Sequence, residues 1–238
     1  MNYYRRSELT PDVSATLARY DETARGFVGP DYPYPVRMRD WELARVLEAA
    51  RAVPAGSSIL DTGSYNTYLP LVLAAQGYRL TASDLMWSRM RKSFERQLRL
   101  APAKATEAPY LTWMGVYRRA RVPVRNLDLT RLACPDAAFD CLVALSVIEH
   151  IPAVETALSE MYRVLAPGGR LLITTDCAPS PSPYDRGVRY FSEAELEALF
   201  RPYPVTSRRN SPDFARENWC YGLGRPVVTA FVEVTKPR

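Results

Sequence analysis

The chain has 238 residues, 47% of them hydrophobic and 24% charged, so it is long enough for one α/β domain with additions and can bury a core. No run approaches about eighteen apolar residues, and the first residues lack the apolar stretch of a secretory signal, so we expect a cytoplasmic protein with no membrane span. The net charge of +5 comes almost entirely from arginine, which a solvated basic surface explains more simply than nucleic-acid binding.

The first 55 residues predict two helices separated by a loop. Apolar residues recur at helical spacing over residues 11–25, and a proline-rich stretch follows at 29–37. A second helix is expected over 41–53, with Asp40 as its N-cap. We interpret residues 1–55 as a helical N-terminal extension or lid on a sheet domain formed by 56–238. Its aromatic side chains either close over a ligand or pack against the sheet.

The stretch from residue 57 to 85 predicts a β–α–β unit around which the rest of the chain is organised. An apolar strand ends at Asp61, a turn follows, and a helix is expected over Leu69–Ala75. A second strand ends at Asp84. In open parallel sheets ligands bind at the carboxyl ends of the strands, and these two acids stand there.

The interval between Asp84 and Asp128 is longer than one crossover needs. A basic helix is expected over residues 87–100, and an insertion around 101–121. That insertion either shapes a pocket at the ligand edge or is a surface addition. A third strand over 122–127 then leads to Asp128.

The second half continues the alternation of strands and helices. The expected strands cover residues 139–146, 170–175, 205–209 and 227–234, and a tight turn is expected at 167–169. Helices are expected over 153–165 and from a Ser192 capping box to residue 200. Together these elements predict an α/β fold: a doubly wound, seven-stranded, mostly parallel sheet with the helical N-terminal extension.

Four motifs occur in an order that resembles one family, the class I S-adenosylmethionine-dependent methyltransferases. They read SILDTGS, LTASDL, NLDLTRLACPDAAFDCLVALSVIEHI and MYRVLAPGGRLLITT. The resemblance covers most of residues 57–200. It implies S-adenosylmethionine as the cofactor.

By this resemblance, one acidic residue follows each of the first three strands of the cofactor site. Asp61 and Gly63 would face the amino acid part of the cofactor. Asp84 would accept hydrogen bonds from both ribose hydroxyls, and Leu85 would pack on the adenine. Asp128 would accept from the adenine amino group.

The remaining cofactor contacts that the resemblance implies come from two loops and one backbone group. The Leu129 backbone N–H would donate to the adenine ring, and Ser146 and Val147 would lie beside the methionine part. The first turn would also contribute Ser64, Tyr65 and Asn66.

The first turn departs from the family pattern D-x-G-x-G-x-G. Only Gly63 is kept, because Tyr65 replaces the second glycine and Thr67 the third. The second glycine lets the backbone approach a ligand closely. A tyrosine there needs a backbone conformation open to a residue with a Cβ, and its ring must point away from the cofactor or lie over it.

Methyl transfer needs alignment of the acceptor, the methyl group and the sulfur, and a base where the acceptor carries a proton. His150, the only histidine, lies just after the fourth strand beside Glu149, and both are candidate catalytic residues. The alternative is that this pair is a structural part of the strand-end turn. The four cysteines show no CxxC or Cys/His spacing, so we expect reduced thiols and no metal site.

We therefore expect an enzyme that methylates oxygen or nitrogen of a small-molecule acceptor, as in specialised metabolism. One alternative is an enzyme that cyclises or transfers the aminocarboxypropyl arm of the cofactor. Others are an RNA methyltransferase and a non-catalytic binding protein. Nucleic acid is disfavoured as a partner because residues 146–149 read SVIE, where base amino-methylating enzymes carry Asn/Asp-Pro-Pro-aromatic. The sequence sets no oligomeric state.

Overall fold

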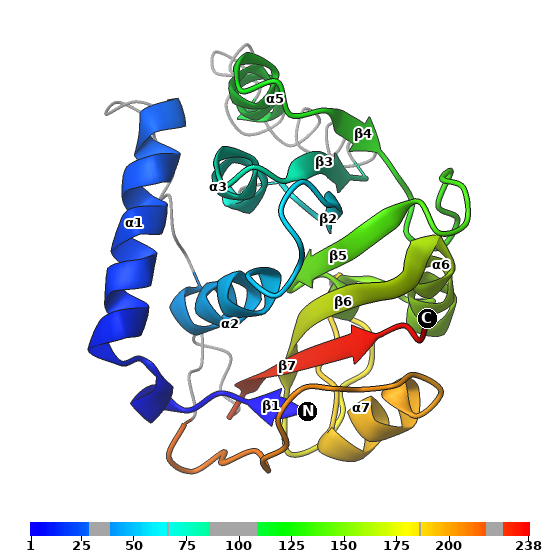
Figure 1. Ribbon diagram of the computed structural model, residues 1–238. Coiled ribbons are helices and arrows are strands. Elements are labelled where there is room, and N and C mark those ends of the chain that lie inside the picture. The colour runs from blue at the N-terminus through cyan, green and yellow to red at the C-terminus, as the bar shows by residue number, and fades with distance from the viewer. Residues whose placement is uncertain (29–38, 66, 86–108, 186, 218–225) are drawn as a thin grey trace, which may run out of the picture.

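A seven-stranded sheet forms the centre of the molecule (Figure 1). The computed structural model describes residues 1–28, 39–65, 67–85, 109–185, 187–217 and 226–238. The strands are β1 Asn2–Tyr3, β2 Ser58–Thr62, β3 Arg79–Asp84, β4 Val124–Asn126, β5 Phe139–Leu145, β6 Leu165–Cys177 and β7 Val228–Thr235. Their order is β1-β7-β6-β5-β2-β3-β4, and β4, β3, β2, β5 and β6 pair in parallel. The predicted fold class is confirmed.

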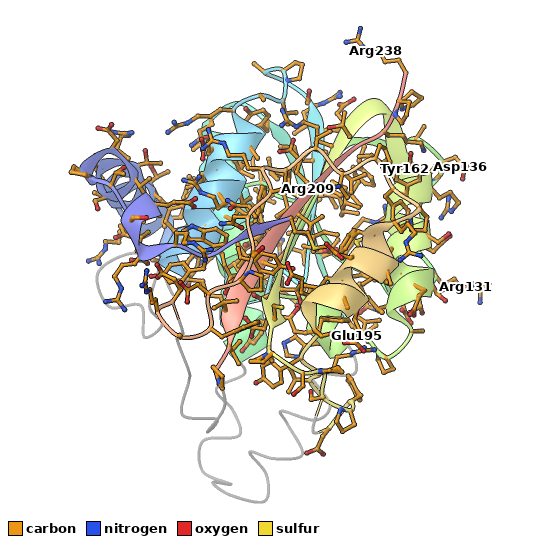
Figure 2. All side chains as sticks on the ribbon, turned by 90° about the horizontal axis from the view of Figure 1, so that it is seen from below. Arg131, Asp136, Tyr162, Glu195, Arg209 and Arg238 are labelled. Carbon is orange, nitrogen blue, oxygen red and sulfur yellow. The ribbon has the colours of Figure 1, made fainter. Side chains whose placement is uncertain are left out.

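Helices cover both faces of the sheet. They are α1 Pro11–Val28, α2 Asp40–Ala50, α3 Leu69–Ala75, α5 Pro109–Arg119, α6 Val154–Val164 and α7 Glu193–Phe200, with 3-10 turns η1 Arg6–Glu8 and η3 Ile148–His150. One face carries α1, α2, α3 and α5, and the other carries α6 and α7. Figure 2 shows α6 and α7 on the flank opposite α1.

The central strands are apolar throughout because both of their faces are covered. Successive side chains of a strand point to opposite faces. Thus Ile59 packs with the α1–α5 side and Leu60 with the α6–α7 side, and both are fully buried. Cys141 and Leu142 divide in the same way on β5. Each such apolar side chain contributes about 2 kcal/mol by leaving water.

Helix starts were predicted correctly at α7 and wrongly at α2. At α7, Ser192 Oγ accepts from the Glu195 N–H and the Glu195 carboxylate accepts from the Ser192 N–H, as expected for a capping box. At α2 the N-cap position belongs to Arg39, and Asp40 is the first helical residue. An acid in the first turn still interacts favourably with the helix dipole.

The outer edge of β7 differs from the prediction. The strand expected at 205–209 is reduced to a single bridge between Val205 and Val234. The other half of that edge pairs with β1, which the sequence did not predict, and Tyr3 lies opposite Ala230. Asn210 fixes this arrangement, because its side chain accepts from the Tyr3 N–H at 2.6 Å and donates to the Tyr3 carbonyl at 3.0 Å.

The predicted turn at 167–169 is part of β6. The strand begins at Leu165 and pairs with Phe139 before a register shift toward Cys141. Gly168 takes a φ of +78°, and a Cβ on Gly169 would lie 2.9 Å from the Asp140 carbonyl oxygen. Because glycine allows both features, the chain passes through the bend without leaving the sheet.

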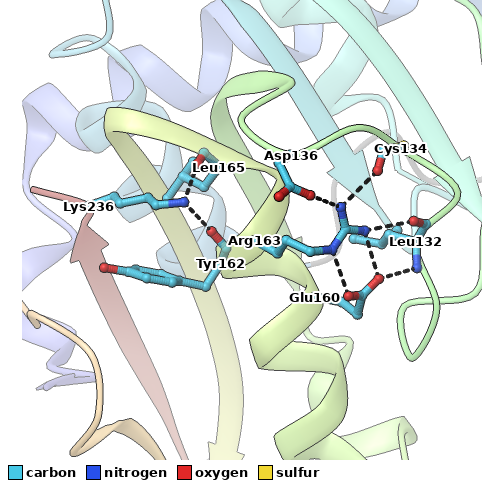
Figure 3. Close-up of polar contacts among 8 residues, drawn as sticks. All are labelled: Leu132, Cys134, Asp136, Glu160, Tyr162, Arg163, Leu165 and Lys236. Carbon is cyan, nitrogen blue, oxygen red and sulfur yellow. Dashed lines mark hydrogen bonds and ion pairs between the residues drawn. The ribbon is translucent and has the colours of Figure 1, made fainter. Parts of the chain in front are cut away.

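One arginine of α6 holds the segment that follows β4. Figure 3 shows Arg163 donating to the Glu160 carboxylate at 2.8 Å and to Asp136 at 2.6 Å. The same guanidinium donates to the carbonyls of Leu132 and Cys134 at 2.9 and 3.0 Å. A planar fork with five donors is suited to join several acceptors at once. This anchor fixes the path of the chain next to the candidate adenine end of the site.

The N-terminal helices share their packing with the sheet domain. Leu17, Tyr20 and Ala24 of α1 belong to the same buried cluster as residues of α2, α3 and the strands. The division into an extension of residues 1–55 and a domain of 56–238 stays a prediction, as does the insertion at 101–121. The proline-rich stretch, the basic helix at 87–100 and residues 101–108 lie outside the described residues. Among the helices that are described, none has the length and apolarity to cross a membrane.

Candidate functional site

The first predicted turn lies at the carboxyl end of β2 and is joined to the end of β3. Ser64 Oγ donates to the Asp61 carboxylate at 2.6 Å, and Ser83 N–H donates back to Ser64 Oγ at 3.2 Å. The Ser64 N–H also reaches the Ser83 carbonyl at 2.9 Å. Asp61 is 2% exposed, and burial raises its pKa to about 7, opposed by the Ser64 hydrogen bond. The two strand ends therefore form one rigid unit.

Gly63 brings this turn into contact with the end of β5. Its φ is +68°, and a Cβ added there would lie 2.5 Å from Val147 Cγ2. Both the backbone conformation and the close approach require glycine. The structure thus brings together Gly63 and Val147, which the sequence placed in one cofactor site from motifs 84 residues apart.

Asp84 ends β3 beside the first turn. Its carboxylate accepts from the Tyr65 N–H at 3.1 Å, and its carbonyl accepts from the Leu127 N–H at 3.2 Å. Leu85, the next residue, is 42% exposed. A buried acid next to an exposed apolar side chain suits a ligand with both hydroxyls and a flat apolar face.

The position of the Tyr65 ring shows how the first turn accommodates a tyrosine in place of the second glycine. Its ring contacts Trp113 of α5 edge to face, with centroids 5.8 Å apart, and Trp113 in turn packs on Tyr117 at 4.7 Å. Tyr117 Oη donates to the Thr67 carbonyl at 2.8 Å. The side chain that replaces the second glycine therefore packs into an aromatic cluster with α5. Asn66, predicted beside it, lies outside the described residues.

Asp128 and Leu129 follow β4. Asp128 is exposed, and its Oδ1 accepts from the N–H and the hydroxyl of Thr130 at 2.9 and 2.7 Å. These bonds are those of a turn-forming aspartate. Leu129 is 8% exposed and packs in the core. Both residues thus stand at the strand end where the motif predicted them, and Asp128 also shapes its own turn.

Ser146 lies at the carboxyl end of β5 in a left-handed conformation, with a φ of +52°. Such a conformation is uncommon for serine and needs support from its surroundings. The support is local: Ser146 N–H donates to Thr174 Oγ1 at 2.9 Å and to the Thr174 carbonyl at 3.1 Å. Ser146 Oγ donates to Glu42 at 2.7 Å and accepts from Arg39 at 2.6 Å.

Glu42 is a site residue that the sequence analysis missed. Its side chain is 1% exposed and accepts from the hydroxyls of Ser146 and Thr174 at 2.7 and 2.6 Å. Arg39 pairs with its other oxygen at 2.6 Å, and the Thr229 hydroxyl approaches that oxygen at 3.4 Å. One carboxylate therefore ties α2 to the ends of β5, β6 and β7.

The candidate catalytic pair, Glu149 and His150, divides into a buried and an exposed member. His150 is exposed, and its Nδ1 lies 2.6 Å from the Gly187 carbonyl, so Nδ1 carries the proton of that bond. Glu149 is 1% exposed and accepts from Thr175 Oγ1 at 2.9 Å. Of the two, Glu149 points into the protein at the sheet edge.

Asp176, near the end of β6, is a second residue that the sequence analysis missed. It is 6% exposed, and its Oδ1 lies 3.6 Å from Arg39 Nη1. Burial raises the pKa of Asp176 to about 6, although Arg39 acts in the opposite direction. Burial and the nearby Asp176 raise the pKa of Glu149 to about 8.

Both missed acids had a signal in the sequence. Glu42 is a charged residue on the inner face of a helix whose other inner residues are apolar, and Asp176 directly follows the predicted strand at 170–175. An acid at such a position is buried only where it has partners or a function. Glu42 and Asp176 come together only because the fold brings α2 and the end of β6 to the same edge of the sheet. No local sequence pattern predicts that contact.

The fold and this edge define a class of protein. A doubly wound sheet that gathers a glycine turn and carboxylates at the carboxyl ends of its parallel strands is a Rossmann-like domain that binds a nucleoside cofactor. A sequence profile described as a methyltransferase domain matches residues 36–207, more than two thirds of the chain. The chain belongs to the class I S-adenosylmethionine-dependent methyltransferase family.

Individual relatives are distant. The chain is 28% identical over 178 residues to the S-adenosyl-L-methionine-dependent Diels-Alderase iccD of Talaromyces variabilis, a match that covers 74% of this chain and 56% of that protein. The chain thus spans about half the length of this curated relative.

Two solved structures show the same fold. One is 1,6-didemethyltoxoflavin-N1-methyltransferase of Burkholderia thailandensis with S-adenosylhomocysteine, at a TM-score of 0.55 and 20% identity, covering 100% of this chain and 93% of that one. The other is the [4+2]-cyclase SpnF, at a TM-score of 0.58 and 18% identity, covering 95% and 94%.

Proposed function

We propose that the protein transfers a methyl group from S-adenosylmethionine to oxygen or nitrogen of a small molecule. The observation that carries this proposal is the convergence of Asp61, Gly63, Asp84 and Val147 at one strand edge in a chain of this family. The 1,6-didemethyltoxoflavin-N1-methyltransferase supports a small acceptor, because its structure holds 1,6-didemethyltoxoflavin together with S-adenosylhomocysteine.

The residues present fit the cofactor. The Asp84 carboxylate, acceptor-only when ionised, would bind the ribose hydroxyls, and exposed Leu85 would cover the adenine. The turn at Asp61 and Gly63 would face the amino acid part, next to Val147. With Tyr65 turned into the α5 cluster, its backbone N–H stays bonded to Asp84 and its ring leaves the turn open.

When bound, the cofactor supplies an electrophilic methyl group on a sulfonium. The chain's part in the reaction is to align the acceptor, exclude water and take up a proton. Glu149 would perform the last task, since a carboxyl whose pKa is raised toward neutrality exchanges protons at the working pH. His150, exposed and bonded to the Gly187 carbonyl, would stabilise the turn.

The test is calorimetric titration with S-adenosylmethionine, followed by measurement of S-adenosylhomocysteine in reactions with a library of small acceptors. We expect binding, and turnover with at least one acceptor. Asp84→Asn should weaken cofactor binding without unfolding the protein. A chain that is folded by circular dichroism and binds neither S-adenosylmethionine nor S-adenosylhomocysteine would refute the proposal.

A second candidate is a cyclase that binds the cofactor without consuming it. The observation that favours it is the similarity to the Diels-Alderase iccD over 74% of this chain. The two candidates differ in product: a cyclase converts a polyene without forming S-adenosylhomocysteine. Methylthioadenosine formed from cofactor alone would instead indicate chemistry on the aminocarboxypropyl arm.

A further inference from the structure

Three buried carboxylates surround one guanidinium at the carboxyl ends of β5 and β6. We call Glu42, Glu149 and Asp176 the acidic cluster; they are 1%, 1% and 6% exposed. Arg39 pairs with Glu42 and Asp176, and its charge lowers the pKa of Glu149. If all three acids are ionised, the cluster carries two negative charges more than Arg39 neutralises, in surroundings where unpaired charge is expensive.

Glu42 already has the partners that a buried carboxylate needs. Arg39 lies 2.6 Å from its Oε1, and the Ser146 and Thr174 hydroxyls donate to its Oε2. The same guanidinium nitrogen reaches Asp176 Oδ1 only at 3.6 Å, beyond hydrogen-bonding distance. Arg39 therefore hydrogen-bonds to Glu42 and forms a longer ion pair with Asp176, so one positive charge is shared among three carboxylates.

Glu149 and Asp176 each present a buried oxygen with an unused lone pair. Thr175 Oγ1 donates to Glu149 Oε2, whereas Glu149 Oε1 has no hydrogen-bond partner among the described residues, and neither has Asp176 Oδ1. Buried polar atoms almost always have a hydrogen-bond partner. The two unpaired oxygens therefore indicate that a hydrogen-bond donor from a ligand binds here. Glu149 is bonded to Thr175 and Asp176 is the next residue of β6, so both acids lie at the same strand end, close enough for the charge of Asp176 to raise the pKa of Glu149.

We propose that the acceptor is an organic amine, whose protonated nitrogen binds between Glu149 and Asp176. This inference rests on the proposed methyltransferase function and names its substrate class. An ammonium group has N–H donors and no acceptor, so it can satisfy both orphan oxygens and supply the missing charge. A neutral hydroxyl has one donor and no charge, and a carboxylate ligand would be repelled.

The position of the cluster connects it to the methyl donor. Ser146, which by family resemblance lies beside the methionine part of the cofactor, is bonded to Glu42 and Arg39 and stands three residues before Glu149. A nitrogen bound at Glu149 is therefore held at the strand edge where the cofactor is expected to lie. Glu149 and Asp176 bind and orient the ammonium group, and Arg39 and Glu42 hold the surrounding backbone. Before transfer the ammonium would give one proton to the Glu149 carboxylate, which frees the nitrogen lone pair that accepts the methyl group.

The test compares matched pairs of one carbon skeleton, so that only the donor group differs. Suitable pairs are benzylamine and benzyl alcohol, 2-phenylethylamine and 2-phenylethanol, and cyclohexylamine and cyclohexanol. Each is titrated calorimetrically into protein saturated with S-adenosylhomocysteine. In at least one pair the amine should bind about tenfold or more tightly than the alcohol, as expected for a charge-assisted hydrogen bond.

Variants separate a charge effect from a packing effect. Glu149→Gln and Asp176→Asn keep the shape of the side chains and should each reduce amine affinity about tenfold or more. Glu197→Gln, the same change on the exposed side of α7, should leave it within about twofold. Near pH 7, titration in two buffers of different ionisation enthalpy should show about one proton released from Glu149 in the wild type and none in Glu149→Gln.

The outcomes distinguish the two proposals. If the protein binds S-adenosylhomocysteine but no amine is favoured over its alcohol, the amine proposal is overturned and the methyltransferase proposal stands. Amine binding that is unchanged in both Glu149→Gln and Asp176→Asn also overturns it. If S-adenosylhomocysteine does not bind to folded protein, the proposed function fails and the acceptor class fails with it.

Discussion

The stability of the protein should fall as the pH rises from about 5 to about 8, and Glu149 should be the largest single contributor to that loss. Burial raises the pKa of Glu149 from 4.5 to about 8, with Asp176 adding to the effect. Between these values the folded protein keeps the proton, whereas the unfolded chain releases it. The stabilisation is therefore complete below pH 4.5 and is lost as the pH passes through about 8.

The size of the effect follows from that difference in pKa. At about 1.4 kcal/mol per pKa unit, a change from 4.5 to about 8 corresponds to about 5 kcal/mol as an upper limit. Most of this stabilisation is lost between about pH 5 and about pH 8. Glu149→Gln cannot ionise, so its free energy of unfolding should change much less over this range.

The assay is urea unfolding followed by tryptophan fluorescence at several pH values, for wild type, Glu149→Gln and the surface control Glu197→Gln. The variant should be the more stable protein at about pH 8, and the control should follow the wild type. Asp61 and Asp176 also have raised pKa values, so a shallower slope of the same sign should remain in Glu149→Gln. Equal pH slopes for Glu149→Gln and wild type would refute the reasoning.

Three further changes test other parts of the structure. Gly63→Ala should lower both the melting temperature and S-adenosylmethionine affinity, because it combines a φ of +68° with a 2.5 Å approach to Val147; thermal unfolding that matches wild type would contradict this. Asp84→Asn should reduce cofactor affinity about tenfold or more in calorimetry while the melting temperature changes little, since a neutral amide replaces a charged acceptor. Ser192→Ala should cost about 1 kcal/mol in urea unfolding through loss of the α7 cap, and Ser192→Thr, which can still accept the bond, should cost less.

Sequence patterns predicted correctly those helices and strands whose structure depends mainly on their own residues. The helix Leu69–Ala75 was predicted to the residue, and Ser192 and Glu195 form the expected capping box. The sheet class followed from apolar runs such as residues 139–145, since only a strand covered on both faces is apolar throughout. In each case the signal lies within one element.

The predictions were wrong where the structure of an element depends on contacts with a segment far away in the sequence. β1 has two residues and no pattern of its own, and it exists because Asn2 and Tyr3 lie against β7 and Asn210 closes the pair from 207 positions away. The same pairing leaves residues 205–209 only one bridge on β7. Asp40 has the chemistry of an N-cap, but α2 begins at Asp40 itself and Arg39 precedes it.

The candidate site divides in the same way. Gly63 and Asp84 could be predicted because family motifs are short and continuous, whereas Glu42 and Asp176 stand 134 positions apart on different elements. Only the closed fold brings both to Arg39. Sequence reasoning named Glu149 from its motif, but its unpaired oxygen is visible only in three dimensions.

Arg39 and Glu42 change how the N-terminal region should be understood. They stand at the start of α2, within the segment predicted as a lid, yet their side chains hydrogen-bond to Ser146 and Thr174, and Arg39 forms an ion pair with Asp176, at the strand ends. A lid that opens fully would break these bonds and leave Glu42 as an unpaired buried charge, which is costly. We therefore expect the start of α2 to stay fixed against the strand ends when a ligand binds. Any closure over a ligand must come from other segments, and substitutions at Glu42 should disturb the site as strongly as substitutions at the strand ends.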